Sequence, residues 1–171
     1  MTSNQYNYHL LNNNIVLWHH SNNNNDWSID SYNKLFFLES IEDYFIMMNK
    51  LNEKIIINEM FFFMKEGILP TWEDPKNING GCISIKVPLK DSYNMWKILL
   101  NNMLLDKLEG NITGISITPK RNFNIIKIWI EDIIEDIKTY NFPKECDLKN
   151  KIILFRIHKT NIEKDNNKST K

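Results

Sequence analysis

Seven short segments rich in β-branched and aromatic residues recur along this chain of 171 residues, and polar loops separate them. Segments of this kind, bounded by Asn, Pro and Gly, are typical of β-strands. We expect strands at 15–20, 34–38, 59–64, 82–87, 112–118, 125–130 and 151–158. Helical periodicity is confined to three stretches, at about 40–52, 91–108 and 131–140. Strands interleaved with helices at irregular intervals predict an α+β fold, with the helices on one face of a mostly antiparallel sheet.

A chain of this length can bury one continuous core without a disulfide or a metal. We expect a single domain over residues 1–160 and a polar, disordered tail over 161–171. The first helix begins after Ser40, a typical N-cap residue with Asp43 three positions later. Its apolar residues cover an arc of roughly 160°, although inward packing needs only about 100°. Either this helix is deeply seated, or the edge that carries Ile41 and Phe45 is left for a partner.

Charge and cysteine content exclude several functional classes. The 21 basic and 21 acidic residues give no net charge, so bulk electrostatics cannot hold a long phosphate backbone. Cys82 and Cys146 form no C-x-x-C motif and lack paired histidines, which disfavours zinc. His19 and His20 are adjacent on a predicted strand and point to opposite faces, so they cannot chelate one metal. Without a signal-peptide pattern or a membrane-spanning apolar run, we expect a cytoplasmic protein with no metal, no cofactor and no membrane contact.

Trp72 stands out among the five tryptophans because it lies in a loop between Pro70 and Pro75, beside Glu73 and Asp74. An indole face attracts positive charge, and a nearby carboxylate neutralises it. This combination suits a planar, cationic ligand. The same pattern is also compatible with a tryptophan that packs onto its own domain.

The sequence around Trp72 resembles the eukaryotic translation initiation factor 4E family, the messenger-RNA cap-binding proteins. Residues 67–81 follow the family pattern G-I-x-P-x-W-E-D-x-x-N-x-x-G-G throughout. Further matches are Leu17-Trp18, Asp26-Trp27, Ile41-Glu42-Asp43-Tyr44, Ile126-Lys127-Ile128-Trp129 and His9-Leu10-Leu11, in which Leu10 replaces a proline. The resemblance extends from about His9 to Trp129, and more loosely to His158.

The resemblance implies a curved antiparallel sheet with three helices on its convex face and a cap site on its concave face. Trp27 and Trp72 would stack on either side of 7-methylguanine, whose positive charge strengthens stacking on indole. Glu73 would accept charge-assisted hydrogen bonds from the guanine edge, and Trp129 would contact the methyl group. Lys120 takes the place of a phosphate-binding arginine.

Some positions depart from the family pattern. Cys82 replaces an arginine after the paired glycines, and Ile125 replaces a phosphate-binding lysine. Arg121 is a second candidate for the phosphates, and Lys127 also lies close in sequence. The alternation of side chains along a strand does not establish whether these cations share one face.

The resemblance also implies a partner surface for a helical peptide motif of a scaffold factor or a repressor. Its residues would be His9, Leu11, Ile41 and Phe45. Phe45 replaces the family's tryptophan and loses its indole N–H donor, and Ile98 replaces an acidic contact.

We therefore expect a monomeric, non-enzymatic protein that binds the 7-methylguanosine cap of messenger RNA in translation initiation. The alternative is a cap-binding regulator that recruits a repressor or a dedicated adaptor, as the changes at Phe45 and Ile98 suggest. A third hypothesis is an enzyme that acts on nucleotides through Glu73 and Asp74, but no nucleophile or metal-ligand pattern accompanies them.

Overall fold

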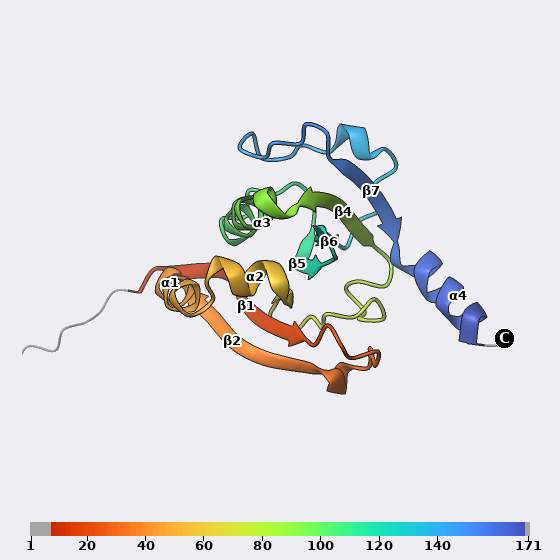
Figure 1. Ribbon diagram of the computed structural model, residues 1–171, viewed down its shortest axis with the longest axis horizontal. Coiled ribbons are helices and arrows are strands. Elements are labelled where there is room, and N and C mark those ends of the chain that lie inside the picture. Colours follow the sequence, from red (N-terminus) through yellow and green to blue (C-terminus); the bar gives the residue numbers. More distant parts are fainter. Residues whose placement is uncertain (1–7, 170–171) are drawn as a thin grey trace, which may run out of the picture.

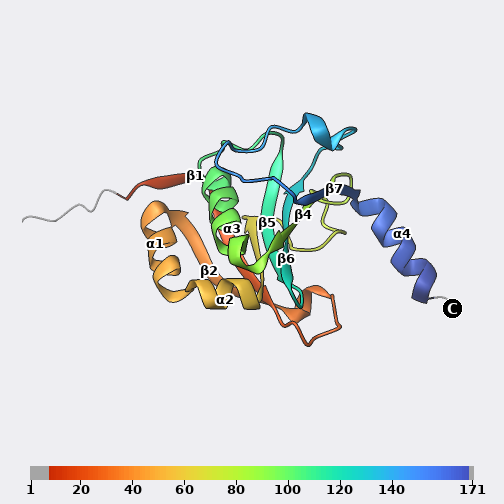
Figure 2. The ribbon, with the colours of Figure 1, turned by 45° about the horizontal axis from the view of Figure 1, so that its top comes forward.

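The computed structural model describes residues 8–169, and most of them build one curved, seven-stranded sheet (Figure 1, Figure 2). The strand order is β2-β1-β3-β5-β6-β4-β7, and every neighbouring pair is antiparallel. The strands are β1 (Leu10–His20), β2 (Tyr32–Ser40), β3 (Met60–Lys65), β4 (Gly81–Pro88), β5 (Ile112–Pro119), β6 (Phe123–Ile130) and β7 (Ile152–Ile157). This confirms the predicted α+β class and all seven predicted strands.

Three helices cover one face of the sheet: α1 (Ile41–Lys50), α2 (Glu53–Asn58) and α3 (Leu89–Leu104). The fourth helix, α4 (His158–Ser169), follows β7 directly and points away from the sheet (Figure 1, Figure 2). Two 3-10 helices, η1 (Ile29–Ser31) and η2 (Ile137–Thr139), lie in loops. Within residues 8–169, no helix is long and apolar enough to cross a membrane.

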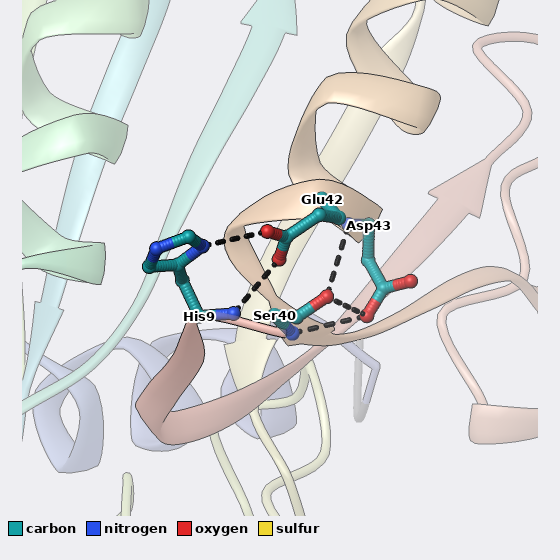
Figure 3. A network of polar contacts seen from close by, with 4 residues as sticks. All are labelled: His9, Ser40, Glu42 and Asp43. Carbon is teal, nitrogen blue, oxygen red and sulfur yellow. Dashed lines mark hydrogen bonds and ion pairs between the residues drawn. The ribbon is translucent and has the colours of Figure 1, made fainter. Parts of the chain in front are cut away.

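A capping box fixes the start of α1, as the sequence predicts (Figure 3). Ser40 Oγ accepts a hydrogen bond from the backbone N–H of Asp43 at 3.2 Å, and Asp43 Oδ2 accepts one from the backbone N–H of Ser40 at 3.0 Å. Two N–H groups that would otherwise lack partners are thereby satisfied. This cap fixes the end of β2 relative to the first turn of α1.

The sheet is buried on both faces at β3, where successive side chains enter two different clusters. Phe61 and Phe63 pack toward the helices, and Phe63 lies 5.4 Å from the ring of Trp96 on α3. Met60, Phe62 and Met64 belong to a second cluster on the opposite face. That second cluster lies opposite α1, α2 and α3, and it contributes Met60, Phe62 and other residues to the lining of the cavity described below.

The predicted helix at 131–140 is wrong, because acidic side chains at its start form hydrogen bonds and ion pairs with other loops. Asp132 Oδ2 accepts a hydrogen bond from the backbone N–H of Asn111 at 2.8 Å, and Glu131 pairs with Lys76 Nζ at 3.2 Å. Only the short η2 forms there, with Asp136 as its N-cap. The third helix on the sheet is instead the unpredicted α2.

Of the tail that the sequence predicts to be disordered, residues 161–169 belong to α4 in the structure. Residues 170–171 of that tail, and residues 1–7 of the predicted domain, lie outside the described residues.

Candidate functional site

A cavity of about 790 Å³ opens on the face of the sheet opposite α1, α2 and α3. Five residues that the sequence singled out line it together: Trp27, Trp72, Glu73, Lys120 and Trp129. They come from the β1–β2 loop, the β3–β4 loop, the β5–β6 turn and strand β6. The fold therefore brings residues more than 100 positions apart in the sequence to one concave site.

The β3–β4 loop is held by two buried polar residues of the W-E-D-x-x-N stretch. Asp74 accepts hydrogen bonds from the backbone N–H groups of Leu69 and Lys76, at 2.9 and 2.8 Å. The side-chain amide of Asn77 donates to the carbonyl oxygens of Leu69 and Thr71, at 3.0 and 2.8 Å. Asp74 thus stabilises the loop by hydrogen bonds to its backbone. These bonds account for the burial of its carboxylate without a catalytic role.

Trp72 and Glu73 are the side chains that this loop presents to the cavity. Trp72 is half-buried and Glu73 is exposed. Glu73 lies close enough to Tyr32, another lining residue, to affect its ionisation. Burial first, and the charge of Glu73 second, raise the pKa of Tyr32. A carboxylate beside a half-buried indole and a buried phenol ring is suited to bind a cationic, hydrogen-bond-donating ring.

Trp27, from the β1–β2 loop, also lines the cavity and is 54% exposed, and its ring stacks on the buried His20. Asp26 orders the turn that contains Trp27, because its carboxylate accepts hydrogen bonds from the N–H and the hydroxyl of Ser28, at 2.8 and 2.9 Å. These bonds lower the pKa of Asp26. The indole is therefore positioned without being buried.

Trp129 is almost fully buried and forms part of the cavity floor. Its Nε1–H donates to Ser116 Oγ at 2.9 Å, so the indole has no free polar group. Its ring centroid lies 5.1 Å from that of His158, the first residue of α4. Trp129 therefore offers the cavity an apolar surface.

Cys82, where the resemblance would place an arginine, is buried against His158. Cys82 Sγ lies 3.0 Å from His158 Nε2, and His158 Nδ1 lies 2.7 Å from the carbonyl oxygen of Asn77. A carbonyl oxygen only accepts, so Nδ1 carries the proton and Nε2 accepts from the thiol. Burial raises the pKa of Cys82 to about 12 and lowers that of His158 to about 4. The pair is thus neutral and supplies no charge to the cavity.

The paired glycines before Cys82 allow three strands to come close together. A Cβ atom on Gly80 would lie 2.0 Å from the carbonyl oxygen of Ile130, and one on Gly81 would lie 2.5 Å from that of Arg156. Both neighbours are backbone atoms, so neither position accommodates a side chain. The glycines set the spacing of β6, β4 and β7 at the end of the cavity floor.

Strand register places Ile125, Lys127 and Trp129 on the same side of β6, and all three line the cavity. The sequence alone does not establish which face of the sheet Lys127 lies on. Because side chains alternate along β6, Lys127 lies on the same face as Ile125 and Trp129. Lys127 Nζ lies 6.0 Å from the ring centroid of Trp72. Ile125 pairs across the sheet with Lys86 of β4, which also lines the cavity.

Four cations therefore face the cavity: Lys86, Lys120, Lys127 and Arg156. Arg121, the second predicted phosphate residue, is exposed on the β5–β6 turn and is not part of the described lining. The turn closes with a hydrogen bond from the N–H of Lys120 to the carbonyl oxygen of Phe123, and Arg121 lies at its tip. The sequence alone did not predict Lys86 and Arg156 as site residues, because their position on the cavity face depends on how β4, β6 and β7 pair.

The predicted partner surface lies on the helical side, around the start of α1. His9 donates through its backbone N–H and through Nδ1 to the carboxylate of Glu42, at 3.0 and 2.7 Å (Figure 3). These contacts lower the pKa of Glu42. Phe45 is 60% exposed, whereas Ile41 and Leu11 are half-buried. Ile98, on α3, is half-buried as well.

Several solved structures share this fold. Caenorhabditis elegans eIF4E-3, in complex with the 4E-binding protein Mextli and a cap analogue, superposes with a TM-score of 0.78 over 92% of this chain and 96% of that one, at 20% identity. Ascaris suum eIF4E-3 with an m7G cap gives a TM-score of 0.67 over 75% and 77% of the two chains, also at 20% identity. At this identity, the similarity establishes the fold.

Sequence relatives carry the same family name. A eukaryotic translation initiation factor 4E homolog of Acanthamoeba polyphaga mimivirus is 38% identical over 53 residues, which are 31% of this chain and 20% of that protein. Initiation factor 4E-1 of Prunus domestica is 24% identical over 124 residues, or 70% of this chain and 53% of that protein. The matched part of this chain thus spans about half or less of the length of these two relatives.

The family model described as eukaryotic initiation factor 4E matches residues 10–171, which include every element of the sheet and the whole cavity. The chain therefore belongs to the eukaryotic initiation factor 4E family.

Proposed function

We propose that this protein binds the 7-methylguanosine cap of messenger RNA and acts in translation initiation. The observation that carries the proposal is the convergence of Trp27, Trp72 and Glu73 on one cavity with a basic floor. Two indoles can stack on both faces of a cationic base, and the carboxylate can accept from the guanine edge. Trp129 closes the end of the slot with an apolar surface suited to a methyl group.

The phosphates of the cap would lie along the floor, where Lys127 and Lys120 face the cavity. Lys127 takes over from the cation missing at Ile125, because it lies on the same side of β6 and two residues nearer to Trp129. The Ascaris and Caenorhabditis structures share this fold and contain a cap or a cap analogue, which supports cap binding by this chain.

Capture on immobilised 7-methyl-GTP tests the proposal. Retained protein should elute with free 7-methyl-GTP and should stay bound in the same concentration of GTP, because only the methylated base carries the positive charge. Equal elution by the two nucleotides, or no retention, would contradict cap recognition.

We further propose that the surface around Phe45 receives a helical peptide from a protein partner. Phe45 and Ile46 are 60% and 52% exposed on α1, which leaves an apolar strip that the domain itself does not cover. The Caenorhabditis relative was solved with the 4E-binding protein Mextli. We also propose that the protein acts as a cytoplasmic monomer.

A second function, in which the chain recruits a repressor or a dedicated adaptor, is favoured by the same residues. Phe45 offers no indole N–H, and Ile98 offers no carboxylate, so a partner that relies on either group would bind weakly. Purification of the protein with its partners from cells separates the two functions. Wild type and Phe45→Asp are compared, and partners lost with Phe45→Asp belong to this surface.

A further inference from the structure

The cavity extends well beyond the tryptophans, to a region that we call the outer floor: Lys86, Phe123, Ile152 and Leu154. Trp129 and Phe123 are six residues apart on β6, so the floor runs for about 20 Å along this strand. Register aligns Ile125, Lys86 and Ile152 in one row across β6, β4 and β7. A base held between Trp27 and Trp72 leaves this row free.

The outer floor combines apolar surface with positive charge. Ile152 and Leu154 are 55% and 46% exposed although their side chains line a cavity. Lys86 Nζ lies 4.3 Å from the ring centroid of Phe123, on the adjacent strand. Exposed apolar side chains beside a cation suit a ligand that is both planar and anionic.

The cavity lining is predominantly basic, although the whole chain has no net charge. Its described lining contains four cations, Lys86, Lys120, Lys127 and Arg156, and Glu73 as its sole acid. Glu73 lies at the tryptophan end, so the charge of the outer floor is positive. A polyanion that starts between the tryptophans would continue along this floor.

We propose that the outer floor binds the first transcribed nucleotide of a capped RNA. The base lies on Phe123, Ile152 and Leu154, and Lys86 contacts the phosphate that follows. This inference rests on the proposed cap binding and extends it, because the protein then recognises a capped RNA in preference to an isolated cap. Single-stranded nucleic acid is commonly bound with bases stacked on aromatic side chains such as Phe123 and with cations along the backbone.

Two capped RNA trinucleotides test the proposal, one with an intact first base and one with an abasic first residue. Both carry the same cap and the same charge, so the ratio of their Kd values reports the base alone. We expect the intact RNA to bind about fivefold tighter or more, from the low end of stacking contributions. A ratio of one in the wild type overturns the inference.

Substitutions in the outer floor test whether the first base binds there. The double variant Ile152→Ser/Leu154→Ser should lower the ratio to the contribution of Phe123 alone, whereas Leu105→Ser, at an exposed leucine outside the cavity lining, should keep the wild-type ratio. Lys86→Gln should weaken the salt dependence of RNA binding. Its matched control is Lys97→Gln, because Lys97 also lies over an aromatic ring, at 5.4 Å from the centroid of Tyr93, but away from the cavity.

The outcomes separate the two proposals. Loss of the intact-to-abasic ratio only in Leu105→Ser, or persistence of the wild-type ratio in the double variant, places the base elsewhere and overturns the assignment. A protein that retains 7-methyl-GTP but gives a ratio of one keeps its proposed function and loses this subsite. A protein that binds neither capped RNA nor 7-methyl-GTP overturns both.

Discussion

His20 lies parallel beneath Trp27, with the ring centroids 4.3 Å apart and the ring planes 1° apart. His20 is fully buried, and its Nε2 lies 2.7 Å from the carbonyl oxygen of Asp26. Because a carbonyl oxygen only accepts, Nε2 carries the proton. The imidazole of His20 therefore donates a hydrogen bond to the backbone before Trp27 and also stacks on one face of its indole. The other face is left for a ligand in the cavity.

Replacement of His20 should weaken cap binding although His20 is not part of the cavity lining. We expect His20→Ala to lower the affinity for 7-methyl-GTP by about two- to tenfold, from the usual contribution of an aromatic pair. His20→Phe keeps the stack and should retain most of the affinity. Fluorescence titration measures both. His19→Ala is the control, since His19 bonds to Glu59 instead, and equal affinities for His20→Ala and His19→Ala would exclude a positioning role.

Loss of either stacking tryptophan should abolish retention on the cap resin. Trp27→Ala and Trp72→Ala each remove one face of the slot, which costs about 1–3 kcal/mol of binding free energy. Both residues come from loops, so circular dichroism should find the fold intact. Phe45→Ala, at an exposed ring on the helical face, is the matched control. A folded Trp variant that binds as tightly as this control would place that residue outside the slot.

Glu73 should determine the preference for guanine over adenine. In Glu73→Gln the side chain keeps its shape but loses its charge, and it presents a donor toward one of the guanine donors. We expect a loss of about 1.5–3 kcal/mol for 7-methyl-GTP, together with a smaller discrimination against the adenine nucleotide. Competition titrations with both nucleotides measure this. Glu135→Gln, at an exposed acid outside the cavity lining, should behave as wild type. Unchanged discrimination in Glu73→Gln would assign guanine recognition to another group.

The fold could be predicted where local patterns and tertiary structure agree. Each of the seven strands contains β-branched or aromatic residues, and α1 has a complete capping box. Helix α2 could not be predicted, because Ile55, Ile56 and Ile57 have low helix propensity. It forms with the side chain of Asn52 as its N-cap and with Ile56 fully buried, and the burial depends on the rest of the fold.

The residues of the site likewise include some that the sequence alone could identify and others that it could not. Trp72, Glu73 and Trp27 lie in loops with recognisable motifs, so the sequence alone could bring them into one hypothesis. Lys86 lies on a strand with no motif around it, and its relation to the site depends on its pairing with Ile125. Such a pairing is a property of register, which a single sequence does not specify.

The free energy of unfolding should rise with pH between about 4 and 6.5. His158 is fully buried, and burial lowers its pKa to about 4, whereas an unfolded histidine takes up a proton near 6.5. In this interval the unfolded state binds more protons, so stability increases with pH, by up to about 3 kcal/mol. The contribution is complete above pH 6.5 and is lost as the pH falls toward 4.

Urea unfolding of wild type and His158→Gln at pH 4.5 and 7 measures this dependence. The glutamine amide retains a donor for the carbonyl oxygen of Asn77 but does not titrate, so the variant should have the shallower pH dependence. Asp26 and Glu42 also have lowered pKa values, and they contribute equally to both proteins. The same pH dependence in both proteins would mean that His158 is protonated in the native state.

The phosphate end of the cavity should gain affinity from a restored cation. Ile125 lines the floor, and Ile125→Lys should raise the affinity for 7-methyl-GTP more than that for 7-methyl-GMP, because only the longer phosphate chain reaches it. Lys127→Gln should have the opposite effect. Each contact should change the slope of log affinity against log salt by up to about 0.7–0.9, a polymer value that is an upper limit for a triphosphate. Titration of both nucleotides at two salt concentrations measures these slopes. Ile133→Lys adds the same charge at an exposed position outside the cavity lining, so an equal gain in that control would mean that net charge alone, and not position 125, attracts the phosphates.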